Sequence, residues 1–160
     1  MKIVAVVIIS ASAIFIAREL SERNRCGLFL MEELMRFLNH ARMQLVCFLR
    51  PQGELGDGFE SDALTGVGFL PTLKKSGSLL SAYESAKGRL QPTEEEDRVI
   101  SLMFSGFGRG YLLEEVKKLD SCLSELSALI DRRRLEMPKK CKLIKTLCAT
   151  ATAGLIILIA

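Results

Sequence analysis

Residues 92–136 read PTEEEDRVISLMFSGFGRGYLLEEVKKLDSCLSELSALIDRRRLE and carry two helix signals around a glycine-rich turn. Thr93 follows a proline and precedes four acidic residues, a pattern typical of a capping box. In that motif the Thr93 hydroxyl accepts from the backbone N–H of Glu96, whose carboxylate reaches back. The acidic first turn also favours the positive end of the helix dipole. We therefore expect a helix to begin at Glu94 and to end near Phe104. Its buried side would hold Val99, Ile100, Met103 and Phe104.

Three glycines follow this helix, at positions 106, 108 and 110. Glycine readily adopts the left-handed conformation that a tight turn between helices needs. After the turn, apolar residues recur at helical spacing up to about Glu136, which predicts a second long helix. Its apolar stripe comprises Leu112, Leu113, Val116, Leu119, Leu123, Leu126 and Ile130. Pro138 lacks a donor N–H, so we expect the chain to kink or restart there.

Upstream, residues 18–49 also follow a helical pattern. The apolar positions of this pattern are Leu30, Leu34, Leu38, Ala41, Leu45 and Leu49. Pro51 should end the helix, and the three glycines in residues 52–58 favour a loop. Residues 63–87 predict two short helices that meet near Ser76 and Gly77, with the first broken into pieces by Gly66, Gly68 and Pro71. No segment alternates like a strand. The expected class is therefore all-α, an antiparallel bundle of about four to six helices.

Uncharged apolar segments of 15 residues occupy both ends, at 3–17 and 146–160. As a helix, each covers about 22 Å, less than the ~30 Å of a bilayer core. Basic residues flank their inner sides: Arg18, Arg23, Arg25, Arg132, Arg133, Arg134, Lys139, Lys140, Lys142 and Lys145. The positive-inside bias then places residues 18–145 in the cytoplasm, and snorkelling side chains make short spans tolerable. We expect a membrane segment at 1–17, a cytoplasmic helical bundle at 18–145 and a second membrane segment at 146–160.

A cleaved secretion signal is the alternative for the N-terminus, with Lys2 as its charged region and residues 11–13 as a small-residue cleavage site. Cleavage after Ala13 would leave four apolar residues, 14–17, as a tail. The three arginines that follow would also hinder translocation. A membrane segment is therefore the preferred interpretation, and a secreted helical protein is the alternative.

The charge distribution bears on partners. Residues 28–131 carry 11 lysines and arginines against 16 aspartates and glutamates, a net charge of −5. The surplus of positive charge thus lies beside the apolar ends, where it suits anionic lipid headgroups and not a nucleic-acid footprint. The five cysteines, at 26, 47, 122, 141 and 148, form no Cys-x-x-Cys pair, and there is one histidine. We expect neither a zinc site nor a disulfide framework.

The sequence offers few groups for catalysis. His40, beside Asn39 and Arg42, is expected to be a solvated or capping residue and not a general base. The carboxylates of residues 94–97 point in different directions around a helix and cannot converge on one metal ion. The glycine-rich turn lacks a preceding strand and a Gly-Lys-Ser/Thr ending, so it predicts a helix turn and not a nucleotide loop. We expect no catalytic residue, cofactor or metal. A membrane-tethered small helical enzyme or ligand-binding protein is the alternative.

The segment Leu90-Gln91-Pro92-Thr93-Glu94-Glu95-Glu96-Asp97 resembles the Leu-Thr-x-x-Asp/Glu helix start of the stage III sporulation protein AB family of endospore-forming bacteria. Phe107-Gly108-Arg109 resembles the Leu-Gly-Arg turn of that family. The order of the following helix, basic stretch and last apolar segment is also similar, so the likeness covers nearly the whole chain. The family's soluble part resembles the cytoplasmic domains of the type II secretion inner-membrane protein F. Gly110, Tyr111 and Pro138 depart from the family pattern.

The resemblance implies a non-enzymatic, membrane-anchored scaffold or adaptor of the channel-like complex that links mother cell and forespore during sporulation. Its partners would include a cytoplasmic secretion-type ATPase and ring-forming membrane proteins, with no small-molecule substrate. The expected location is the mother-cell outer forespore membrane. The candidate partner contacts are Glu94, Glu95, Asp97, Phe107, Arg109 and Tyr111.

Overall fold

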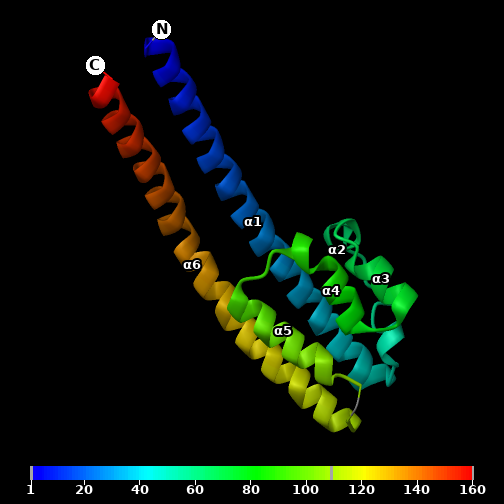
Figure 1. Ribbon diagram of the computed structural model, residues 1–160. Coiled ribbons are helices and arrows are strands. Elements are labelled where there is room, and N and C mark those ends of the chain that lie inside the picture. Colours follow the sequence, from blue (N-terminus) through cyan, green and yellow to red (C-terminus); the bar gives the residue numbers. More distant parts are fainter. Residues whose placement is uncertain (1, 109, 160) are drawn as a thin grey trace. The chain divides into compact units, whose positions relative to one another are not determined.

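A computed structural model describes residues 2–108 and 110–159, with side chains described at residue 12, at 15–144 apart from 109, and at 146, 150 and 154. This part of the chain is 84% helical, with six α-helices and no strand, which confirms the all-α class. The helices follow one another along the chain in Figure 1. They are α1 (Lys2–Phe48), α2 (Asp62–Gly66), α3 (Phe69–Ser76), α4 (Leu79–Leu90), α5 (Glu94–Gly106) and α6 (Leu112–Ile159), with a 3-10 turn at Gln52–Glu54.

The chain divides into two compact units. We call Gly27–Arg132 the core unit, and Met1–Cys26 together with Arg133–Ala160 the terminal unit. The core unit contains α2 to α5 and the adjoining parts of α1 and α6, whereas the terminal unit contains only the outer parts of α1 and α6. The predicted segment limits at 17/18 and 145/146 remain predictions.

Helix α1 is continuous from Lys2 to Phe48, so the predicted first helix does run straight on from the apolar end segment. Five of its six predicted apolar positions are buried: Leu30, Leu34, Leu38, Ala41 and Leu45. Leu49 was predicted to share that stripe but is 69% exposed. The helix has ended before this residue, and its φ of 54° is left-handed, so helical spacing no longer sets its direction. The stripe also omitted Met31 and Phe37, which are fully buried.

Residues 62–90 form three short helices. Gly68 begins α3 with a φ of 89°, and Gly77 ends it with a φ of 65°, both in the left-handed region that favours glycine. The break near Ser76 and Gly77 is therefore where the sequence predicted it. Phe69 of α3 packs against α1, where the Phe37 ring meets its ring edge-on at 5.1 Å.

Helix α5 begins with the predicted capping box. The Thr93 hydroxyl accepts from the Glu96 N–H at 3.3 Å, and the Glu96 carboxylate accepts from the Thr93 N–H at 2.7 Å. All four residues predicted to face the core on this helix are buried. Caps of this kind contribute about 1 kcal/mol to stability. Because the capping box lies within Thr93 to Glu96, this helix start could be predicted from the local sequence.

Helix α6 runs without interruption through Pro138. The sequence predicted a kink or a restart there, and the restart is not found, because the bonds of the neighbouring turns hold a long helix together around one missing N–H. Its predicted stripe is buried at Leu119, Leu126 and Ile130. Leu112 and Leu113 were also predicted to be buried but are 41% and 70% exposed. They lie in the first turn of α6, at the margin of the core.

Among the residues that the structure describes, no helix has a stretch long and apolar enough to cross a membrane. The predicted membrane segments, 3–17 and 146–160, lie mostly among residues whose side chains are not described.

Candidate functional site

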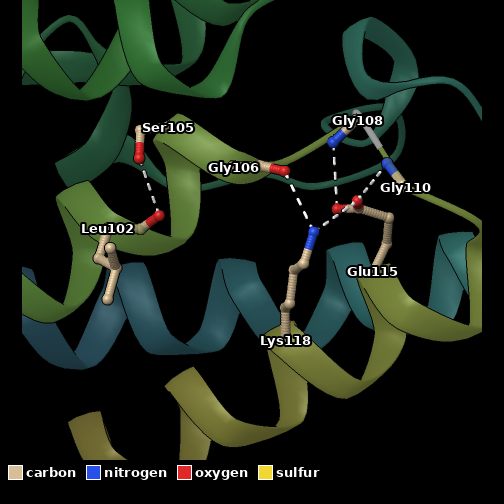
Figure 2. Close-up of polar contacts among 7 residues, drawn as sticks. All are labelled: Leu102, Ser105, Gly106, Gly108, Gly110, Glu115 and Lys118. Carbon is tan, nitrogen blue, oxygen red and sulfur yellow. Dashed lines mark hydrogen bonds and ion pairs between the residues drawn. The ribbon is translucent and has the colours of Figure 1, made fainter.

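The glycine-rich turn between α5 and α6 closes around the carboxylate of Glu115, a side chain only 4% exposed (Figure 2). Its Oε2 accepts from the backbone N–H of Gly108 at 3.0 Å, and its Oε1 accepts from the N–H of Gly110 at 2.9 Å. The ammonium of Lys118 lies 3.1 Å from Oε1 and donates to the Gly106 carbonyl at 3.4 Å. One acidic side chain of α6 therefore fixes the backbone of the turn.

Two glycines make this arrangement possible. Gly108 has a φ of 82°, and a Cβ at Gly110 would lie 2.8 Å from Glu115 Oε1. Successive backbone N–H groups that converge in a turn form a concavity that binds anions. Here the anion is the chain's own carboxylate, so the glycines have a structural use within the helix turn.

The charge of Glu115 is stabilised by these donors. Burial alone would raise the pKa of Glu115, but the N–H of Gly108, the Lys118 ammonium and the N–H of Gly110 together lower it below its ordinary value of 4.5. The carboxylate is therefore ionised at neutral pH, and the turn is held by charge-assisted hydrogen bonds.

The acidic start of α5 has a different organisation. Glu96 is 1% exposed and belongs to the capping box. Asp97 Oδ1 accepts from the Tyr83 hydroxyl at 2.9 Å, and its Oδ2 lies 2.8 Å from Lys87 Nζ. Burial would raise the pKa of Asp97, but Lys87 and Tyr83 lower it. The Asp97 carboxylate thus ties α4 to α5, as an internal contact.

The predicted partner contacts fall into two groups at opposite ends of α5. This helix has 13 residues, so the groups are about 20 Å apart. At its start Glu94 is exposed, and Glu95 pairs with Arg132 at 3.3 Å. Beyond its end Tyr111 is 84% exposed, whereas Phe107 is buried and so offers no surface. Arg109 lies outside the described residues.

Part of the basic flank is paired with acidic residues on the same helix. Arg18 lies 3.2 Å from Glu22, and Arg23 lies 3.3 Å from Glu19. Lys140 lies 3.1 Å from Glu136. These pairs are exposed and contribute little to stability. Lys145 is helical, but its side chain is outside the described part.

A groove of about 660 Å³ between α5 and α6 was not foreseen from the sequence. Val99, Met103 and Cys122 lie along it as buried residues, and Leu102 stands at its side, 74% exposed. Burial raises the pKa of the Cys122 thiol to about 11, with a smaller contribution from Glu125. The only sequence signal was that Leu102 lies between buried positions 99, 100, 103 and 104 and therefore points away from the core.

His40 and the cysteines were considered from the sequence as candidates for catalysis or metal binding. His40 is half-buried, with Nε2 3.0 Å from the backbone carbonyl of Asp57, so it joins α1 to the loop that follows. Cys26 and Cys47 are exposed, Cys122 is buried and Cys141 is half-buried, while the side chain of Cys148 is not described. In the described part, no three His, Cys, Asp or Glu side chains gather in a way that could hold a metal ion.

Comparison of this chain with known protein families, curated proteins and solved structures finds no match. The resemblance to the stage III sporulation protein AB family therefore depends on the motifs at 90–97 and 107–109 and on the order of the segments.

Proposed function

We propose that this chain is a non-enzymatic helical scaffold, anchored in the membrane, that couples a cytoplasmic secretion-type ATPase to the membrane components of a mother cell–forespore channel. The main support is the use made of buried polar side chains in the core unit. Among the described residues of this unit, the buried polar side chains are Ser61, Glu96 and Glu115.

Each of the three holds a piece of backbone. Ser61 accepts from the Leu64 N–H at 3.3 Å at the start of α2, Glu96 completes the cap of α5, and Glu115 holds the turn before α6. A catalytic or ligand site instead needs polar groups that converge on a shared cavity. A bundle that uses its buried charges to fix its own helix ends is suited to hold partners at a defined spacing.

The outer part of α6 offers support for the membrane anchor. The hydroxyls of Thr146 and Thr150 donate to the backbone carbonyls of Lys142 and Thr146 at 3.0 and 3.1 Å. Hydroxyls bonded within their own helix cost less in an apolar surrounding than free ones. The inner basic residues would then meet anionic headgroups.

The candidates for contact with the ATPase are Tyr111, Glu94 and Glu95, which are exposed, together with Arg109, which lies outside the described residues. The test is retention of the ATPase by the full-length chain in detergent. Tyr111→Ala should lower retention about tenfold, because exposed aromatic side chains are common binding anchors. Phe29→Ala is the matched control, since Phe29 is an exposed aromatic residue on α1.

Glu94→Lys tests the other end of α5, with Glu84→Lys as its control, because both glutamates are exposed helical residues. Retention that falls only for the Tyr111 or Glu94 variant supports the proposal and identifies the contact surface. An intact chain that retains no ATPase, or variants that all retain it equally, would contradict the proposal.

A further inference from the structure

The groove between α5 and α6 combines a protruding residue and a hollow on one face. Leu102 is 74% exposed at the side of the groove, while Val99, Met103 and Cys122 are each less than 8% exposed along it. A large apolar side chain beside an apolar hollow allows a self-complementary interface, in which each copy inserts its side chain into the other.

The charges beside the groove are also complementary. Arg98 lies along the α5 side and Glu125 along the α6 side. Within the described part of the chain, neither residue forms a hydrogen bond or an ion pair. Apart from Lys118, which pairs with Glu115, the groove therefore carries one cationic and one anionic side chain, each available to a partner.

These two charges lie within about one helical turn of each other along the groove. Helices α5 and α6 run in opposite directions, with Lys118 beside Gly106 and Arg132 beside Glu95. Arg98 is about 12 Å before Gly106 along α5, and Glu125 is about 10 Å after Lys118 along α6. By the same count Leu102 lies level with Cys122, one turn away from the charges.

We propose that a second copy of this chain occupies the groove, related by a two-fold axis that runs along it. Such an axis lays α5 of each copy over α6 of the other while it preserves the level of every residue. Arg98 of one copy then meets Glu125 of the other, and Leu102 enters the hollow beside Ser121 and Cys122. Both contacts occur twice, as a two-fold interface requires. This inference does not depend on the proposed function.

The test is the mass of the full-length chain in detergent, measured by sedimentation velocity over a range of concentrations. Arg98→Glu and Glu125→Arg should each weaken the dimer about tenfold or more, because each places like charges together at the interface. The double variant R98E/E125R should restore wild-type dimerisation, because the pair is re-formed with its signs exchanged.

Two controls carry the same charge changes away from the groove. Lys75→Glu on α3 and Glu84→Arg on α4 alter exposed residues and should leave the dimer unchanged. Leu102→Ser removes the inserted side chain and should weaken the dimer without loss of helicity, because the residue is exposed in a single copy. The Leu102→Ser variant provides an independent test of the interface if a charge variant fails to fold.

A wild-type chain that is monomeric at its highest soluble concentration would overturn the proposal and leave the groove to another protein. A dimer that persists in the Arg98, Glu125 and Leu102 variants would also overturn it, because association would then use another surface, such as the terminal segments. Loss in the single variants with recovery in the double variant would establish the interface.

Discussion

Glu115 is a buried charge that is stabilised by the backbone around it. The four acceptor sites of its carboxylate meet two backbone N–H groups and one ammonium, so desolvation is offset by charge-assisted hydrogen bonds. This residue was not singled out from the sequence. The signal that could have found it is the turn itself, because the N–H groups of Gly108 and Gly110 need an acceptor, and Glu115 is the second acidic residue after them.

Replacement of Glu115 by Gln tests this residue directly. The amide cannot accept from both N–H groups, so Glu115→Gln should lower the free energy of unfolding by about 2 kcal/mol near neutral pH. Urea unfolding of the full-length chain in detergent, followed by circular dichroism, measures it. Glu114→Gln is the control at an exposed neighbour and should change little.

The same variant has a defined pH dependence. The folded pKa of Glu115 lies below its ordinary value of 4.5, so its stabilising effect is complete above that value and is lost as the pH falls through the folded pKa. The difference in unfolding free energy between wild type and Glu115→Gln should therefore shrink below pH 4.5. A difference that stays constant down to strongly acidic pH would show that the carboxylate charge does not hold the turn.

At the scale of the element, a helix start encoded by adjacent residues was predictable, whereas the burial of residues at the edge of the core was not. The start of α5 was predictable because the capping box lies entirely within Thr93 to Glu96. Leu49 and Leu113 were misplaced because spacing predicts which side of a helix a residue faces, but not where the neighbouring helices end. The α5–α6 groove could not be predicted from the sequence for a related reason, since its shape depends on how two helices pack.

Pro138 offers a test of α6. A proline inside a helix costs about 3 kcal/mol relative to alanine, because it removes a hydrogen bond and crowds the carbonyl four residues earlier. In a continuous helix, Pro138→Ala restores the bond to the Arg134 carbonyl. Amides of the adjoining turns should then exchange hydrogen more slowly, by up to about a hundredfold.

Hydrogen exchange of the full-length chain in detergent, read by mass spectrometry, gives this rate for segments on either side of residue 138. Leu135→Ala is the matched control, because it changes an exposed residue of the same helix without restoring a backbone bond. Unchanged exchange in Pro138→Ala would mean that the chain restarts at Pro138 after all.

At the scale of the whole molecule, the sequence predicted the helical class and the order of the helices, because each helix carries its own periodicity and stop signals. The division into a core unit and a terminal unit falls inside α1 and α6, so no loop or helix end marks it. It arises because α1 and α6 are 47 and 48 residues long, far longer than the helices between them. The proposed anchor requires that a lipid bilayer surround the outer parts of α1 and α6.

The membrane arrangement can be tested by thiol labelling of the chain in oriented vesicles with a membrane-impermeant maleimide. In single-cysteine chains, Cys26 and Cys47 should react only from the cytoplasmic side, because both are exposed and lie between the two end segments. Cys122 should react about a hundredfold more slowly at neutral pH, since burial raises its pKa to about 11 and leaves little thiolate. Ser12→Cys, within the first apolar segment, should resist labelling from either side. Labelling of Cys26 from outside, or a chain recovered without vesicles, would contradict the anchored arrangement.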